Sequence, residues 1–459
     1  MGAYEEMLAR KEVRARPCGF EPGEMPAALF GWQRVVVERA CRAGRYAIFA
    51  DCGLGKTLMQ LEWARQVCRE TGGAVLVVAP LAVAAQTVAE GEKFGIPAAQ
   101  AREMPDGPSG IVVTNYEMLD RFDMTAFAGV VLDESSILKS FTGKTKRRLT
   151  EACREVPYRL SCTATPSPND LMELLNQSEF LGVMRSSEAL SVWFVNDQSE
   201  AGRYRLKGHA VASFWAWVAT WATALSRPSD LGFPDDGFEL PPLTERDVVV
   251  ETDQRGDEGE PTLFHVPSLS ATSFHREKRR SLEARCEAAA AVARNYADLA
   301  HEQVVVWCYL NDESSLLARL IPGAVEVRGG DSPEEKERAA RGFQAGEFRV
   351  LVSKPSIFGF GLNFQQCSHE VFCGLDYSFE SYYQAVRRVY RYGQRDPVEV
   401  VRVVGRDELR ILDAIGRKAD MHAAERDSIA RAVAGGESAF RLSAPGAPIP
   451  EISFLKEAC

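Results

Sequence analysis

The pattern of hydrophobic and polar positions predicts two runs of alternating strands and helices. In the first run, short apolar segments stand between longer stretches with helical periodicity, such as TLMQLEWARQVCRE. Short apolar runs that alternate with amphipathic helices are typical of a parallel sheet with helices on both faces. The strands predicted in this run are residues 46–50, 74–80, 110–115 and 129–134.

A second run of the same kind follows a long helical stretch at about residues 272–300. Two successive α/β patterns in one chain indicate two similar lobes. The strands predicted in the second run are residues 303–310, 324–329, 349–355, 369–374 and 398–405.

The segment between the two runs has a different composition. SFWAWVATWATALS, residues 213–226, is aromatic and apolar at helical spacing, and we interpret it as a packing helix rather than a base-stacking surface. Residues 227–245 are rich in Pro, Gly and Asp, which indicates a loop or an interdomain connection. The expected domains are an N-terminal lobe (1–230), a linker (231–245), a C-terminal lobe (246–425) and a C-terminal tail (426–459).

Composition places the chain among globular proteins of two or more domains. The 459 residues are 46% hydrophobic and 26% charged, without an apolar run of about 18 residues, so no membrane contact is expected. The N-terminus lacks the apolar core of a signal peptide. Eleven cysteines without a CxxC pair are expected to be reduced thiols rather than zinc ligands, which indicates a cytoplasmic protein.

The net charge of −10 argues against a protein that coats nucleic acid by bulk attraction. The basic stretches at residues 139–148 and 276–280 leave room for a local basic track. Each stretch is also consistent with a solvated helix face.

A glycine-rich turn, DCGLGKT, separates the first predicted strand from a helix, which is the context of a phosphate-binding loop. Gly53, Leu54 and Gly55 would bring backbone amides close to phosphate oxygens. Lys56 would reach the β- and γ-phosphates of ATP, and Thr57 would bind magnesium. The strict pattern has glycine where this chain has alanine at position 50, and a glycine turn formed by chance is the alternative.

Two adjacent carboxylates, Asp133 and Glu134, follow the apolar run of the fourth predicted strand. Asp133 would hold the magnesium ion, and Glu134 would orient and activate the attacking water. An ordinary Asp-Glu turn at a strand end is the alternative.

Eight segments in this order resemble the motifs of superfamily 2 helicase-type ATPases, most closely the Swi/Snf-like group, which is related to the DEAD/DEAH-box proteins. The resemblance runs through most of residues 25–420 and is weak over 185–300. The segments are LFGWQ, DCGLGKT, VVAPLAVAAQTVAE, VVTNYEML, LDESSILKS, LSCTATPSPNDLMELLNQSEFL, FGFGLNFQQCSHEVF and YYQAVRRVYRYGQ.

The resemblance implies two tandem RecA-like lobes, each a mostly parallel sheet flanked by helices, with ATP in the cleft between them. It assigns Gln33 to the adenine side, Gly361 to close backbone approach and Gln384 to orientation of the same site. Arg388 and Arg391 are three positions apart, so on a helix they would share a face and could bind the γ-phosphate.

The family often has Ala-His after the Asp-Glu pair, where this chain has Ser135 and Ser136. Catalysis does not need that imidazole, so we expect the change to affect coupling between hydrolysis and movement. Thr163 and Thr165 are hypothesised hydrogen-bond partners of Ser136.

The implied function is an ATP hydrolase with magnesium, a DNA-binding translocase or helicase that moves along or remodels duplex or branched DNA. Thr114 and nearby amides would hold the strand through its phosphates. A compact bacterial or phage protein that works with replication, recombination or defence proteins fits this size. The alternatives are a P-loop ATPase that acts on protein partners and a nucleotide-binding scaffold without turnover.

Overall fold

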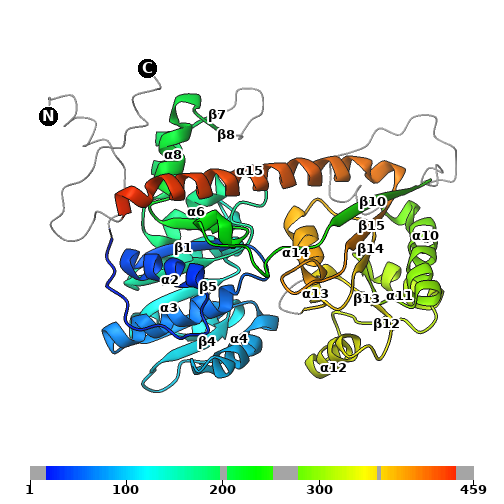
Figure 1. Cartoon of the computed structure of the whole chain (residues 1–459), viewed down its shortest axis with the longest axis horizontal. Coiled ribbons are helices and arrows are strands. Elements are labelled where there is room, and N and C mark those ends of the chain that lie inside the picture. Colours follow the sequence, from blue (N-terminus) through cyan, green and yellow to red (C-terminus); the bar gives the residue numbers. More distant parts are fainter. Residues whose placement is uncertain (1–16, 197–203, 252–277, 359–362, 441–459) are drawn as a thin grey trace. The chain divides into compact units, whose positions relative to one another are not determined.

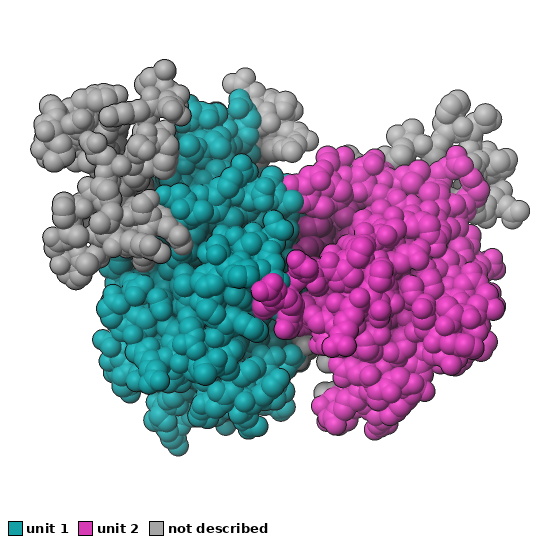
Figure 2. Space-filling model, viewed as in Figure 1, with its two compact units in different colours: residues 1–235, 421–459 teal, residues 236–420 magenta. Residues whose placement is uncertain are grey.

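The computed structural model of the chain describes residues 17–196, 204–251, 278–358 and 363–440. It divides the chain into two compact units. Unit 1 comprises residues 1–235 and 421–459, and unit 2 comprises residues 236–420 (Figure 2).

Unit 1 is built on a seven-stranded sheet whose strands all pair in parallel (Figure 1). The four strands predicted in the first part of the chain are confirmed as β1, β2, β4 and β5, and their residues are almost entirely buried. Across the sheet, the order is β3 (Ala98–Gln100), β4 (Ile111–Asn115), β2 (Ala74–Ala79), β5 (Phe127–Asp133), β6 (Tyr158–Cys162), β1 (Arg45–Ala50) and β9 (Ala222–Leu225).

Helices connect these parallel strands, as the alternating pattern requires. A two-stranded antiparallel hairpin, β7 (Phe194–Asn196) with β8 (Tyr204–Leu206), lies outside the main sheet. The α-helices of this part of the chain are α2 (Gly31–Ala43), α3 (Lys56–Thr71), α4 (Leu81–Lys93), α5 (Lys144–Ala152), α6 (Glu173–Leu181), α7 (Ser186–Trp193) and α8 (Val211–Val218).

The single helix predicted over residues 213–226 is wrong in its second half. Helix α8 ends at Val218, and β9 follows as an edge strand that pairs with β1. Apolar periodicity alone does not separate a buried helix from a short buried strand. The expectation of a packing role is confirmed, because Trp217 and Trp221 are buried in the core of unit 1.

Unit 2 contains a six-stranded sheet, which is also parallel throughout. All five strands predicted in the second run are present, although β12 is much shorter than predicted. The strand β10 falls partly in the segment that the sequence assigned to a linker. Across the sheet, the order is β10 (Leu243–Val250), β15 (Val398–Gly405), β14 (His369–Cys373), β11 (Val304–Cys308), β13 (Val350–Ser353) and β12 (Val325–Glu326).

The predicted helical stretch at 272–300 is in part confirmed by α10 (Leu282–Arg294), which continues as a π-helical turn over Asn295–Ala300. Residues 272–277 lie outside the described part of the chain. The other α-helices of unit 2 are α11 (Asn311–Leu320), α12 (Pro333–Gln344), α13 (Pro355–Phe358) and α14 (Phe379–Val389).

The last described helix, α15 (Leu409–Phe440), extends through residues that the sequence placed in the end of the second lobe and in a tail. Residues from Met421 onward belong to unit 1. Ile429 and Val433 from this helix lie in the hydrophobic core of unit 1.

Candidate nucleotide-binding site

The glycine-rich turn has the backbone geometry of an anion-binding loop. It links β1 to α3, and Gly53 and Gly55 have φ angles of 88° and 70°. Glycine adopts this left-handed region at little cost, whereas a side chain there is strained. Gly55 is the N-cap of α3, and no side chain caps that end of the helix, so the first amides of α3 are available for an anion.

Lys56 lies back over the loop. Its Nζ donates hydrogen bonds to the carbonyl oxygens of Ala50 (2.8 Å) and Asp51 (3.4 Å). An ammonium group held at this loop, whose amides would bind phosphate oxygens, is placed to contact a phosphate.

Gln33 contacts the same loop from α2. Its side-chain amide donates to the carbonyl of Leu54 at 3.0 Å and accepts from the amide of Phe30 at 3.0 Å. A Cβ atom on Gly55 would come within 2.5 Å of the Gln33 Nε2 atom, so a side chain there would displace the Gln33 amide from the loop.

The two carboxylates at the end of β5 have different environments. Asp133 is buried, and burial raises the pKa of its carboxyl above the usual range, while the Gln60 hydrogen bond and the charge of Lys56 oppose that shift. Gln60 Nε2 donates to Asp133 Oδ1 at 2.7 Å. A cation beside Asp133 would favour its ionised form.

Glu134 stands just beyond the strand with a φ angle of 53°, which is uncommon for a residue with a side chain. The hydroxyl of Thr163, at the end of β6, donates to Glu134 Oε2 at 3.4 Å. Strained backbone of this kind is concentrated at functional sites.

Oxygen donors near the loop fit a magnesium ion. Asp133 supplies a buried carboxylate close to Lys56, and Thr57 supplies a hydroxyl at the start of α3. Among the described residues, no group of three or more His, Cys, Asp or Glu side chains could hold a metal. Magnesium in nucleotide sites is commonly bound by one or two protein oxygens together with phosphates and water.

The hypothesised bond between Ser136 and a threonine does not form in the described structure. The Ser136 hydroxyl donates to the Glu134 carbonyl at 3.4 Å, and Thr163 bonds to the Glu134 carboxylate instead. Thr165 Oγ1 and Ser135 Oγ are buried without a hydrogen-bond partner among the described residues. The Ser135 carbonyl accepts a hydrogen bond from the α6 side chain Gln177 at 2.9 Å.

Unit 2 carries the predicted arginines at α14. Gln384 and Arg388 are on this helix and are buried, and Arg388 Nε donates to the Gln384 carbonyl at 3.0 Å. The Gln384 side-chain amide has no hydrogen-bond partner among the described atoms. The helical face expected for Arg388 and Arg391 is wrong, because α14 ends at Val389. Gly361 lies outside the described residues.

Sequence reasoning missed several residues that contact the site. Gln60 is four positions after Lys56 and therefore lies on the same face of α3, so helical spacing could have indicated it. Asp51 forms an ion pair with Arg426 at 3.1 Å. That pair joins residues 375 positions apart, and no local pattern indicates it.

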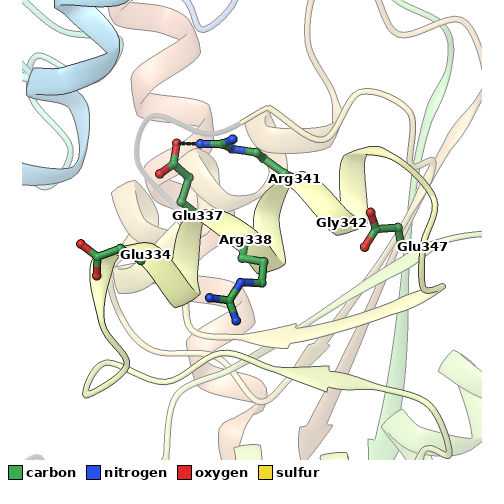
Figure 3. A pocket seen from close by; sticks show the side chains of 6 residues that line it. All are labelled: Glu334, Glu337, Arg338, Arg341, Gly342 and Glu347. Carbon is green, nitrogen blue, oxygen red and sulfur yellow. Dashed lines mark hydrogen bonds and ion pairs between the residues drawn. The ribbon is translucent and has the colours of Figure 1, made fainter.

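A separate hollow of 350 Å³ lies on α12 of unit 2 (Figure 3). Three glutamates and two arginines line it, and Arg341 forms an ion pair with Glu337 there. None of the predicted site residues lines this hollow.

Comparison with known proteins agrees with the fold and the motifs. Residues 289–393 match the model of the helicase conserved C-terminal domain. Putative protein p41 of Acyrthosiphon pisum secondary endosymbiont phage 1 is 24% identical over 457 residues, a match that covers 82% of this chain and 93% of the relative.

Two solved structures are similar to this chain over most of its length. The Sulfolobus solfataricus SWI2/SNF2 ATPase core in complex with dsDNA is 18% identical with a TM-score of 0.42, covering 90% of this chain and 95% of that chain. Mss116p bound to ssRNA and AMP-PNP is 13% identical with a TM-score of 0.53, covering 81% of this chain and 68% of that chain. The second likeness confirms the expected tandem RecA-like fold.

Residues 289–393 carry the helicase conserved C-terminal domain, and the fold is the tandem RecA-like fold expected from the sequence. Both findings agree with the resemblance of the motifs to those of superfamily 2 helicase-type ATPases. Within the described residues, no helix is both long and apolar enough to span a bilayer.

Proposed function

We propose that the chain is a nucleic-acid-stimulated ATPase of the Swi/Snf-like type that uses ATP hydrolysis to move along or remodel DNA. The observation that carries this proposal is the arrangement in unit 1. There α3, which begins at Lys56 of the phosphate loop, is bonded through Gln60 to Asp133 at 2.7 Å, and Glu134 follows directly.

ATP would bind with its phosphates on the amides of Gly53, Leu54 and Gly55 and on the first turn of α3. Lys56 would exchange its bonds to the loop carbonyls for bonds to the β- and γ-phosphates. Gln33 would contact the adenine side, since it already bonds to the loop at Leu54.

Asp133 and Thr57 would hold magnesium, which supplies positive charge to the phosphates when it is bound. Glu134 would orient the attacking water and accept its proton, and its bond to Thr163 would fix the carboxylate. Gln384, Arg388 and Arg391 from unit 2 are proposed to complete the site, with the arginines at the γ-phosphate.

We place the nucleic-acid track of unit 1 at the start of α4, where Leu81 is exposed. Thr114, which the sequence also assigned to this track, is 1% exposed and is therefore not available to contact a phosphate. The motif order supports a duplex-DNA track, and contacts to phosphates would make binding largely independent of sequence. A DNA translocase of this kind would work in the cytoplasm, which suits the ten free cysteines of the described residues. Replication, recombination or defence proteins are its proposed partners.

The test is steady-state ATP hydrolysis by the full chain without polynucleotide and then with single-stranded DNA, duplex DNA, branched DNA and RNA. We expect strong stimulation by duplex or branched DNA. Stimulation by RNA and by no DNA would show that the track is RNA and that the proposed DNA track is wrong. Hydrolysis that ignores every nucleic acid would favour an ATPase acting on proteins, and binding without hydrolysis would favour a scaffold.

A further inference from the structure

Polar side chains on the second half of α15 contact the two segments that surround the candidate nucleotide site. Arg426 Nη1 lies 3.1 Å from Asp51 Oδ2, at the start of the phosphate loop. The Ser167 hydroxyl donates to the Glu425 carboxylate, and His422 Nε2 donates to the Ala164 carbonyl at 2.9 Å. All of these residues belong to unit 1.

These contacts are largely buried and therefore differ from ordinary surface pairs. Asp51, Glu425 and His422 are 5%, 2% and 1% exposed, and the Arg426 side chain is 19% exposed. Ile429, one turn beyond Glu425 on the same helix, is fully buried in the core of unit 1. Exposed ion pairs contribute little, whereas a buried charge that loses its partner is strongly unfavourable.

The Asp51 carboxylate connects the helix to the backbone of the loop. Its Oδ1 atom accepts a hydrogen bond from the Cys52 amide at 2.7 Å, and its Oδ2 atom faces Arg426. Lys56 Nζ also bonds to the Asp51 carbonyl. A shift of Asp51 would therefore move both the Cys52 amide of the loop and the carbonyl that holds Lys56.

We propose that Arg426 is a positioning residue of the nucleotide site, which holds Asp51 and through it the phosphate loop in the conformation that binds ATP. This role depends on the proposed function, in which ATP binds at the phosphate loop, and it gives α15 a part in nucleotide binding. Without the guanidinium, the Asp51 carboxylate loses the ion pair that holds its Oδ2 atom, and the loop backbone that Asp51 shares with Lys56 is less firmly held. Nucleotide affinity should fall, while bound ATP should still be hydrolysed at nearly the normal rate.

The experiment measures binding of N-methylanthraniloyl-ATP with magnesium to the full chain, together with kcat and KM for ATP. Arg426→Gln should weaken binding and raise KM about tenfold, because a hydrogen bond to a charged group is lost, with little change in kcat. Arg426→Lys should restore part of the affinity.

Arg431→Gln is the matched control, since Arg431 is on the same helix but pairs with Asp427 at 3.9 Å and is 77% exposed. It should bind nucleotide as the wild type does. Asp51→Asn tests the contact from the loop side, and its effect should not add to that of Arg426→Gln. This second variant keeps the test valid if Arg426→Gln also lowers the melting temperature.

Two failures are distinguishable. If the wild type does not bind the analogue, the proposed function and this inference both fail. If the wild type binds it and Lys56→Ala does not, but Arg426→Gln and Asp51→Asn bind like Arg431→Gln, the proposed function stands and the positioning role is wrong.

Discussion

At the scale of single residues, the candidate site combines side chains that the sequence indicated with others that only the fold brings in. The strand, the glycines and Lys56 are local in sequence, and the Asp-Glu pair follows a strand whose apolar pattern is clear. Thr163 reaches Glu134 because β5 and β6 are neighbours in the sheet, which the chain order alone does not determine.

Gln60 gives the first residue-scale prediction. It donates the side-chain hydrogen bond to Asp133 Oδ1, so Gln60→Leu should raise the pKa of that buried carboxyl further and weaken metal binding. We expect the magnesium concentration for half-maximal ATP hydrolysis to rise about tenfold, because one hydrogen bond to a charged group is lost. Gln100→Leu, at an exposed position of edge strand β3, is the control and should leave the magnesium titration unchanged.

The second prediction compares Thr163 with Ser136. It tests which of the two hydroxyl groups orients the Glu134 carboxylate. Thr163 bonds to the Glu134 carboxylate, whereas Ser136 bonds only to the backbone carbonyl of Glu134 at 3.4 Å. Thr163→Val should lower kcat about tenfold with KM for ATP unchanged, since Glu134 loses an orienting bond. Ser136→Ala should stay close to wild type in the same assay. The reverse order of effects would show that Ser136 matters more to water activation than its bond indicates.

At the scale of elements, the strands were predictable and the segment after α8 was not. Parallel strands buried on both faces are continuous apolar runs, and β1, β2 and β5 are of this kind. The strand β9 (Ala222–Leu225) is too short to be identified from periodicity. It is recognised as a strand only through its pairing with β1 in the structure. Helix α15 was not predicted; it crosses residue 425, the expected end of the second lobe, and its residues Ile429 and Val433 lie in the core of unit 1 with residues distant in sequence.

The stability of unit 1 should depend on pH through Glu425, which lies on the second half of α15. Burial raises the pKa of this carboxyl from 4.5 to about 8; the Glu173 charge also raises it, while the bond from Ser167 and the charge of Arg426 lower it. The folded state therefore retains a proton that the unfolded chain loses, so stability is full below about pH 4.5 and falls as the pH rises to about 8.

Glu425→Gln removes this titration. We expect the melting temperature of the wild type to fall more steeply than that of Glu425→Gln between pH 5 and 8. Glu173, whose pKa burial raises to about 7, is present in both proteins, so the difference between the two curves reports Glu425 together with its interaction with Glu173. Parallel curves for the two proteins would mean that Glu425 is already ionised in the folded chain.

At the scale of the whole molecule, two units with separate cores should unfold as separate cooperative parts. In unit 2, Arg285 is completely buried and pairs with Glu313 at 2.7 Å and Glu408 at 3.1 Å. Sequence reasoning did not indicate this cluster, because its members come from α10, α11 and the turn after β15. The two-lobed organisation itself was predictable, since each lobe repeats its own alternation of strands and helices.

Arg285→Met should destabilise unit 2 by about 3–5 kcal/mol, because two buried carboxylates lose their partner. The measurement is urea unfolding followed by hydrogen exchange of β11 and β14 peptides. Arg246→Met is the control: its pair with Glu399 is partly exposed, and we expect a change of about 0–1 kcal/mol. An equal decrease in the free energy of unfolding in the two variants would show that the buried cluster is not a special source of stability.

Under the proposed function, hydrolysis of ATP moves this chain along DNA. Such movement can be measured as displacement of a third strand from a duplex that carries a triplex segment, with ATP and magnesium, using Glu134→Gln as the blank. We expect release of the third strand by the wild type only when ATP is hydrolysed, with the duplex left paired and no release by Glu134→Gln. ATP hydrolysis stimulated by the same duplex without any release of the third strand would contradict it.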